Sequence, residues 1–124
     1  MTGKRYEGLR AFQACDSLVV AVYAAVHTWP KYELYGLTSQ ARRCAFSTAA
    51  NIAEGAGKRG YREFRRYLDI TLGSLSELSY VLRLAHRLKY TTQEEHASLE
   101  QLLDEAGRQT FSLAKSIDRR SQNS

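Results

Sequence analysis

The sequence predicts an all-α protein, an antiparallel up-down-up-down four-helix bundle that assembles as a homo-oligomer. Apolar residues recur at alternating steps of three and four in four segments, which is the spacing of one helix face. The segments are joined by short connections, which favour antiparallel neighbours. The chain has a single Pro and few β-branched runs, and its 124 residues suit one domain over residues 1–124.

The first expected helix covers about residues 9–28. Cys15, Val22 and Val26 belong to its apolar stripe, and Pro30 forces the preceding residue, Trp29, out of helical geometry. The apolar stretch from 18 to 26 superficially resembles the core of a signal peptide, but Asp16 precedes it and it is too short to cross a bilayer. We therefore expect a cytoplasmic protein with no membrane segment.

The second expected helix covers about residues 38–56, with Thr38 as its N-cap. Alanines recur along it, and such small side chains let a neighbouring helix approach closely. Phe46 and Ile52 are expected to be its main apolar contacts with the core. The two cysteines, Cys15 and Cys44, fit no disulfide or zinc spacing, so we expect reduced, packed thiols.

The third expected helix covers about residues 61–89 and carries two apolar seams. Together they are wider than one bundle face requires, so the second seam is predicted to be a subunit interface. That interface is predicted at Tyr67, Ile70, Ser74, Val81, Leu84 and Leu88. Gly73 costs about 1 kcal/mol against Ala in mid-helix, which a close helix crossing would explain.

The fourth expected helix covers about residues 92–118. Thr92 and Glu95 have the spacing of a capping box, in which each side chain bonds the other residue's backbone N–H. The residues from Arg119 to the end are polar and are expected to fray.

Glu54 stands out because it falls at the C-terminal end of the second expected helix, where the backbone dipole disfavours a negative charge. Such a carboxylate is either solvated or held by a cation. We expect Glu54 and Glu77 to be structural anions, each paired with an arginine of a neighbouring helix or subunit. The arginines considered for Glu54 are Arg42, Arg43, Arg62, Arg65 and Arg66.

The net charge of +5 is concentrated in the middle of the chain, where residues 38–90 hold ten basic and four acidic residues. Such asymmetry hints at a nucleic-acid partner. The predicted nucleic-acid-binding residues are Lys58, Arg59, Arg62, Arg65 and Arg66. They interleave with Tyr61, Phe64 and Tyr67, and aromatic rings can stack bases. The alternative is that the aromatic residues are core and the cations form an ordinary solvated face.

Catalytic and metal-binding patterns are missing from the sequence. A di-metal site in a four-helix bundle uses Glu-x-x-His pairs, and none of His27, His86 and His96 has a Glu three residues before it. The glycine pattern of residues 55–60 has the letters of a dinucleotide-binding loop but follows a helix where that motif needs a strand. Glu54 and Glu77 as an acid–base pair is a weaker alternative to a structural role. We expect no enzyme activity, no cofactor and no metal.

Several ordered motifs carry a resemblance over nearly the whole chain: residues 33–40, Arg42-Arg43, residues 51–55, residues 64–68 and residues 73–78. Their sequences resemble the four-helix bundle family first noted as reading frames in the intervening sequences of bacterial 23S rRNA genes. Phe12 stands where the family usually has Trp, and Thr48-Ala49-Ala50 replaces a frequent Ile-Pro-Ser. The residues assigned to the structural motif are Arg42, Arg43, Asn51, Glu54, Gly55, Gly73 and Glu77.

The resemblance implies a four-helix protomer that forms a closed homopentamer. It also implies kinship with the accessory proteins of diversity-generating retroelements, which are basic bundles that engage nucleic acid and a reverse transcriptase. The function predicted from residues and resemblance together is a non-enzymatic oligomeric bundle that binds RNA or DNA through its basic middle. The alternative is a protein-interaction scaffold with no nucleic-acid role, whose partner protein the sequence does not specify.

Overall fold

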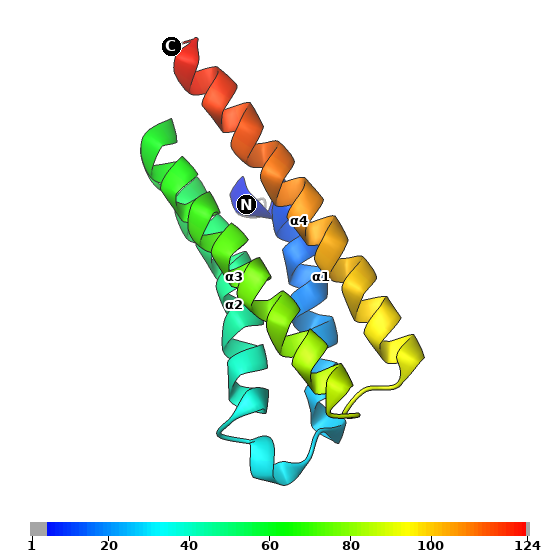
Figure 1. The fold of residues 1–124 in the computed structure, drawn as a ribbon. Helices are drawn as coiled ribbons and strands as arrows, with labels where there is room; N and C mark the ends of the chain where they lie inside the picture. The colour runs from blue at the N-terminus through cyan, green and yellow to red at the C-terminus, as the bar shows by residue number, and fades with distance from the viewer. Residues whose placement is uncertain (1–4, 124) are drawn as a thin grey trace.

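The computed structural model describes residues 5–123, which form four α-helices and three short 3-10 helices and no β-strand (Figure 1). The α-helices are α1 (Arg10–Ala25), α2 (Leu37–Ala56), α3 (Tyr61–Arg87) and α4 (Gln93–Gln122). The 3-10 helices are η1 (Arg5–Gly8), η2 (Val26–Thr28) and η3 (Lys31–Glu33). The all-α class and the four helices predicted from the sequence are confirmed.

Each long helix packs against two others. α1 contacts α2 and α4, and α3 contacts the same two helices. The core is therefore enclosed by one face of each helix. Fully buried side chains from all four helices meet there, among them Leu18, Ile52, Leu68 and Thr110.

The first helix follows its predicted apolar stripe, since Cys15, Leu18 and Val22 are all buried. It tightens into η2 and ends where Trp29 becomes extended before Pro30, as the sequence predicts. Arg10–Thr28 is the one described segment long and apolar enough to cross a membrane by length and composition. In the structure its buried positions face α2 and α4.

The start of α2 differs from the prediction, because Thr38 is buried inside the helix and is not the N-cap. The cap position is Gly36, whose own side chain cannot accept a hydrogen bond. Glu33 acts instead, since its carboxylate accepts a 3.0 Å hydrogen bond from the backbone N–H of Leu37. The usual capping side chain belongs to the N-cap residue itself, so a carboxylate three residues before that position is not found by a search for N-cap residues.

The close crossing of α2 and α3 lies at Gly55, and the predicted crossing at Gly73 is wrong within the protomer. A Cβ added at Gly55 would lie 2.7 Å from Cβ of Tyr67, whereas one at Gly73 would meet nothing within 4 Å. Phe46, predicted to be a core contact, is 60% exposed, whereas Ile52 is fully buried as predicted. The small residues of α2 thus bring α3 close, and Phe46 points away from that contact.

The capping box of α4 is confirmed. The Glu95 N–H donates to the Thr92 hydroxyl at 3.1 Å, and the Thr92 N–H donates to the Glu95 carboxylate at 2.7 Å. α4 continues to Gln122, beyond its expected end near residue 118. Buried Ile117 and the ion pair of Asp118 with Arg65 of α3 tie the preceding turn to the bundle, whereas residues 119–123 are exposed.

Candidate nucleic-acid interface

The turn between α2 and α3 presents the first part of the predicted basic cluster. α2 ends at Ala56, and Gly60, with φ of +80°, lets the chain enter α3 in a conformation that L side chains rarely adopt. Lys58 and Arg59 lie in this turn and Arg62 in the first turn of α3, and all three are exposed. Gly60 at the cap position of α3 makes no side-chain hydrogen bond, so the partial positive charge of the helix end adds to theirs and is offset in part by Glu63 of the first turn.

The second part of the predicted cluster is engaged with acids. Arg65 donates a 2.9 Å hydrogen bond to Asp118 of α4 and also pairs with Asp69. Arg66 pairs with Glu63 at 3.2 Å, and these bonds raise the pKa of Arg66 and lower that of Glu63. Two of the five predicted cations are therefore already paired: Arg65 links α3 to α4 through Asp118, and Arg66 is paired with Glu63.

Arg59 and Arg62 have no carboxylate within ion-pair distance among residues 5–123. Lys58 lies 3.8 Å from Glu54, in a pair whose side chains are 42% and 56% exposed. An exposed pair of this kind contributes under about 1 kcal/mol and is readily exchanged for another anion. Positive charge available to a ligand is thus centred on Lys58, Arg59 and Arg62.

Tyr67 lies between two cations. The Lys58 ammonium is 5.6 Å and the Arg66 guanidinium 4.7 Å from its ring centre. The Tyr67 hydroxyl donates a 3.1 Å hydrogen bond to Glu54. The expectation that an arginine of the same protomer holds Glu54 is therefore wrong: within the described residues its partners are Tyr67 and Lys58, because the close crossing at Gly55 brings Tyr67 beside it.

The other predicted structural anion, Glu77, is also exposed and has no arginine partner among residues 5–123. It lies beside Cys44 of α2. Burial and the neighbouring Glu77 together raise the pKa of the Cys44 thiol to about 11, and burial raises the pKa of Cys15. Both cysteines are buried and free, as predicted. Glu54 and Glu77 contact different residues, so no shared acid–base site joins them.

A hydrogen bond at Ser47 joins the motif segment of α2 to α3. The Ser47 and Ser74 hydroxyls are 2.8 Å apart, and the Asn51 amide donates to Ser47 at 2.9 Å. The adjacent arginines diverge: Arg42 lies over the Tyr23 ring of α1 at 5.9 Å, whereas Arg43 bonds Gln40 on α2 itself. Most of the motif residues therefore serve the packing of α2 against α3.

The predicted subunit interface is narrower in the structure than in the sequence. Ile70 is 38% and Leu88 47% exposed, while Tyr67, Ser74 and Leu84 are half-buried. Val81 is only 5% exposed within the single chain, so it packs in the protomer core and is not available to a second copy.

Sequence reasoning missed a cleft at this end of the molecule. Figure 1 shows the α2–α3 turn and the last turns of α4 at the same end of the bundle. Between them and η1 is a cleft of about 340 Å³, bordered by Lys58 and Tyr61 and also by Arg5 and Arg120. We call this region the basic end. The Arg119-Arg120 pair was a usable signal, since an antiparallel bundle places the end of the fourth helix beside the start of the third.

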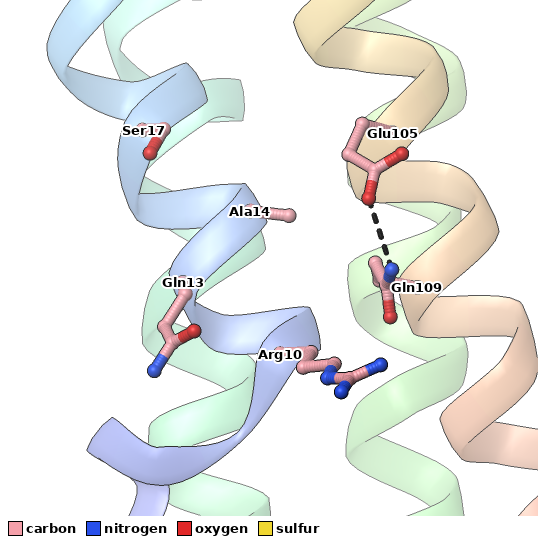
Figure 2. Close-up of a pocket in the computed structure, with 6 residues that line it drawn as sticks. All are labelled: Arg10, Gln13, Ala14, Ser17, Glu105 and Gln109. Carbon is pink, nitrogen blue, oxygen red and sulfur yellow. Dashed lines mark hydrogen bonds between the residues drawn. The ribbon is translucent and has the colours of Figure 1, made fainter.

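Another hollow among the described residues is lined by a carboxylate, that of Glu105. Figure 2 shows a shallow depression between α1 and α4, where Arg10 extends toward α4 and Gln109 donates to Glu105 at 2.9 Å. Bonds from Gln109 and Arg108 lower the pKa of Glu105, so this carboxylate already has its partners.

No group of three or more metal-ligating side chains occurs within residues 5–123. His86 and His96 stack with ring centres 4.2 Å apart and nearly parallel planes. In a parallel stack the nitrogen lone pairs lie in separate planes, which does not suit a shared metal ion. These observations leave the basic end as the best candidate interface.

Comparison with known proteins agrees with the predicted resemblance. Residues 7–112 match the family described as 23S rRNA-intervening sequence protein. The chain belongs to that family. A crystal structure of a protein of unknown function from the S23 ribosomal protein family of Bacteroides thetaiotaomicron has the same fold, with a TM-score of 0.76 and 23% identity. The match covers 85% of this chain and 98% of that one. No curated protein sequence matches the chain.

Proposed function

We propose that this member of the 23S rRNA-intervening sequence protein family is a non-enzymatic, cytoplasmic helical bundle that binds RNA or DNA through its basic end. The observation that carries the proposal is the exposure of Arg59 and Arg62 without a carboxylate partner among the described residues. A basic surface fully neutralised by its own acids has little to offer phosphate, and here Glu54 and Glu63 offset only part of the charge of Lys58, Arg59 and Arg62. Arg5 and Arg120 extend the same positive surface.

We further propose that the chain has the up-down-up-down topology and assembles as a homo-oligomer, with the pentamer implied by the family resemblance. Short connections and the order in which helices contact one another support the topology. Exposed Phe46 on α2 and Ile70 on α3, with the open space around Gly73, support an outward contact. In a ring, each basic end is repeated around an axis, and weak phosphate contacts combine into one multivalent surface.

The nucleic-acid proposal is tested by titrating fluorescent RNA and DNA with the protein at several salt concentrations. The logarithm of affinity should fall with the logarithm of salt by about 0.9 per phosphate contacted on duplex DNA, and about 0.7 on single strands. The double variant Arg59→Ala/Arg62→Ala should bind more weakly and flatten this slope.

The matched control is Arg83→Ala/Arg87→Ala, which removes the same charge from exposed positions toward the other end of the bundle. It should leave most of the binding intact. Equal loss in both double variants would mean that net charge, and not the basic end, governs binding. Absence of binding even at low salt would remove the nucleic-acid role and leave the alternative, a protein-interaction scaffold whose docking face includes Phe46 and Ile70.

Assembly is tested by light scattering on the unmodified protein and on Ile70→Glu. The variant places a charge on an outward position, so it should dissociate the oligomer while keeping its helical circular dichroism. Val81→Glu, the corresponding change at a buried position, should unfold the protomer instead. A monomer for the unmodified protein at micromolar concentration would disprove the assembly.

A further inference from the structure

The cleft at the basic end combines an apolar inner wall with a cationic rim. Its inner wall is apolar, since Ala56, Phe64 and Ile117 are all less than 10% exposed. Its rim carries three cations, Arg5, Lys58 and Arg120, which come from η1, the α2–α3 turn and α4. Among residues 5–123 no acidic side chain lines the cleft, although Lys58 also lies 3.8 Å from Glu54.

This combination selects for ligand chemistry. A purely apolar ligand would leave the cations without a partner, and a bare anion would leave the apolar wall exposed to water. The complementary ligand has a flat apolar group and a negative charge a few ångströms away, which describes a nucleotide. Its base would lie on the apolar wall and its phosphate at the rim.

Size and continuity agree with that choice. The volume of about 340 Å³ is at the lower end of the roughly 300–1,000 Å³ typical of small-ligand sites, enough for one nucleotide and not for a duplex. Tyr61 borders the cleft and is only half-buried, so its ring can take part in stacking. Lys58 belongs both to this rim and to the exposed cations with Arg59, so a strand held by those cations passes the mouth of the cleft.

We infer that this cleft is a subsite for one unpaired nucleotide of a single-stranded nucleic acid. The inference rests on the proposed nucleic-acid binding and adds a preference for single strands to it. A base inside a duplex is stacked and paired and cannot enter, so duplexes reach only the exposed cations. Reading of base identity is not part of the inference, because stacking accepts any base.

The test compares a labelled single-stranded RNA of about ten nucleotides with a duplex of the same sequence, ten nucleotides being within the site sizes of single-strand-binding domains. Tyr61→Ala should weaken single-strand binding on the order of tenfold and leave duplex binding nearly unchanged. Tyr35→Ala is the control, because Tyr35 is 93% exposed and lies outside the cleft. Circular dichroism checks that each variant is folded.

A second pair of variants keeps the inference testable should Tyr61→Ala fold poorly. Arg120→Ala should lower the single-strand salt slope by about 0.7, the value for one lost phosphate contact. Arg119→Ala removes the same charge from the neighbouring position of α4, which does not line the cleft, and should change the slope less. Photocrosslinking with 4-thiouridine in the single strand should label Tyr61.

The possible failures can be told apart. If both nucleic-acid forms bind, but Tyr61→Ala and Arg120→Ala leave the single-strand affinity unchanged, the cleft inference is overturned and the proposed function stands. Equal losses on single strand and duplex also overturn it, since they make the cleft part of a general phosphate surface. If neither form binds at low salt, the proposed function fails and this inference fails with it.

Discussion

The two ends of the bundle use their polar residues in different ways. At the end that contains the α3–α4 turn, Glu33 accepts hydrogen bonds from the Leu37 N–H at 3.0 Å and the Tyr90 hydroxyl at 2.7 Å, although Trp29 Nε1 and His96 Nδ1 are buried without a partner among the described residues. At the basic end, Arg59 and Arg62 have no acid partner among the described residues. Arg65 and Arg66 near the basic end do have acid partners, so the difference between the ends lies in Arg59 and Arg62, which remain available to a ligand.

The difference also indicates what holds each end together. The α3–α4 end depends on hydrogen bonds, including the capping box at Thr92 and a 3.1 Å contact of His86 with Thr91. The basic end depends on the close approach of α2 and α3 at Gly55 and on the Arg65–Asp118 bridge to α4. Four predictions test this division, in order of decreasing effect on stability.

Gly55→Ala should destabilise the protein most, by about 1–3 kcal/mol, as overpacking does. Its added Cβ would lie 2.7 Å from Cβ of Tyr67 and 3.0 Å from Cδ1 of Phe64. Gly107→Ala, inside α4, is the control and should stabilise by up to about 1 kcal/mol, because a Cβ there would meet nothing within 4 Å and a helix-interior glycine is costly. Urea denaturation measures both. Equal effects would mean that close packing does not hold the basic end.

Thr92→Ala should cost about 1 kcal/mol, since it removes the side chain that accepts from the Glu95 N–H. Ser98→Ala, at an exposed position inside the same helix, is the control and should stay within about 0.5 kcal/mol of the parent. Thermal melts compare the two. A silent Thr92→Ala would show that the α3–α4 end does not depend on its hydrogen bonds.

Glu33 should make the α3–α4 end sensitive to acid. Bonds from the Leu37 N–H and then from Tyr90 hold the pKa of Glu33 below the ordinary 4.5. A carboxyl with a lowered folded pKa stabilises the fold above its unfolded pKa, and this contribution is lost as the pH falls through the folded value.

Melting temperatures from neutral pH to below about pH 4 should therefore fall less in Glu33→Gln than in the parent protein. A fall in Glu33→Gln as large as that of the parent would mean that the Glu33 carboxylate does not stabilise the α3–α4 end.

Arg59→Ala/Arg62→Ala should have the smallest effect on stability, within about 0.5 kcal/mol, because both side chains are exposed and neither forms an ion pair among the described residues. Chemical denaturation on the preparation used for nucleic-acid titration checks this. A large loss of stability would mean that these arginines support the fold, and the weakened binding could not then be assigned to lost phosphate contacts.

The four helices could be predicted because helix formation depends on the spacing of residues that are close together in the sequence. The stripe through Cys15 and Val22, the stop at Trp29-Pro30 and the Thr92–Glu95 capping box each depend on residues a few positions apart. A chain of this composition also had to bury those stripes against one another, so a helical bundle followed. The family motifs pointed to the same fold.

Side-chain partners were not predictable, because they depend on which residues of different helices meet. The sequence predicted an arginine partner for Glu54, but in the structure the close crossing of α2 and α3 at Gly55 places Tyr67 beside it. Phe46 and Val81 exchanged their expected environments, since a small shift in helix rotation decides which of two apolar faces is buried.

The sequence by itself determined an α-helical chain, its four segments, its uneven positive charge and its family, because periodicity, composition and motif spelling are properties of the chain alone. The tertiary structure decided which of those charges are available. It paired Arg65 with Asp118, fifty-three positions away, and left Arg59 and Arg62 unpaired among the described residues. It also brought Arg5 and Arg120 to the rim of one cleft. Electrostatic partnership depends on distance in space, and only packing of the helices sets that distance.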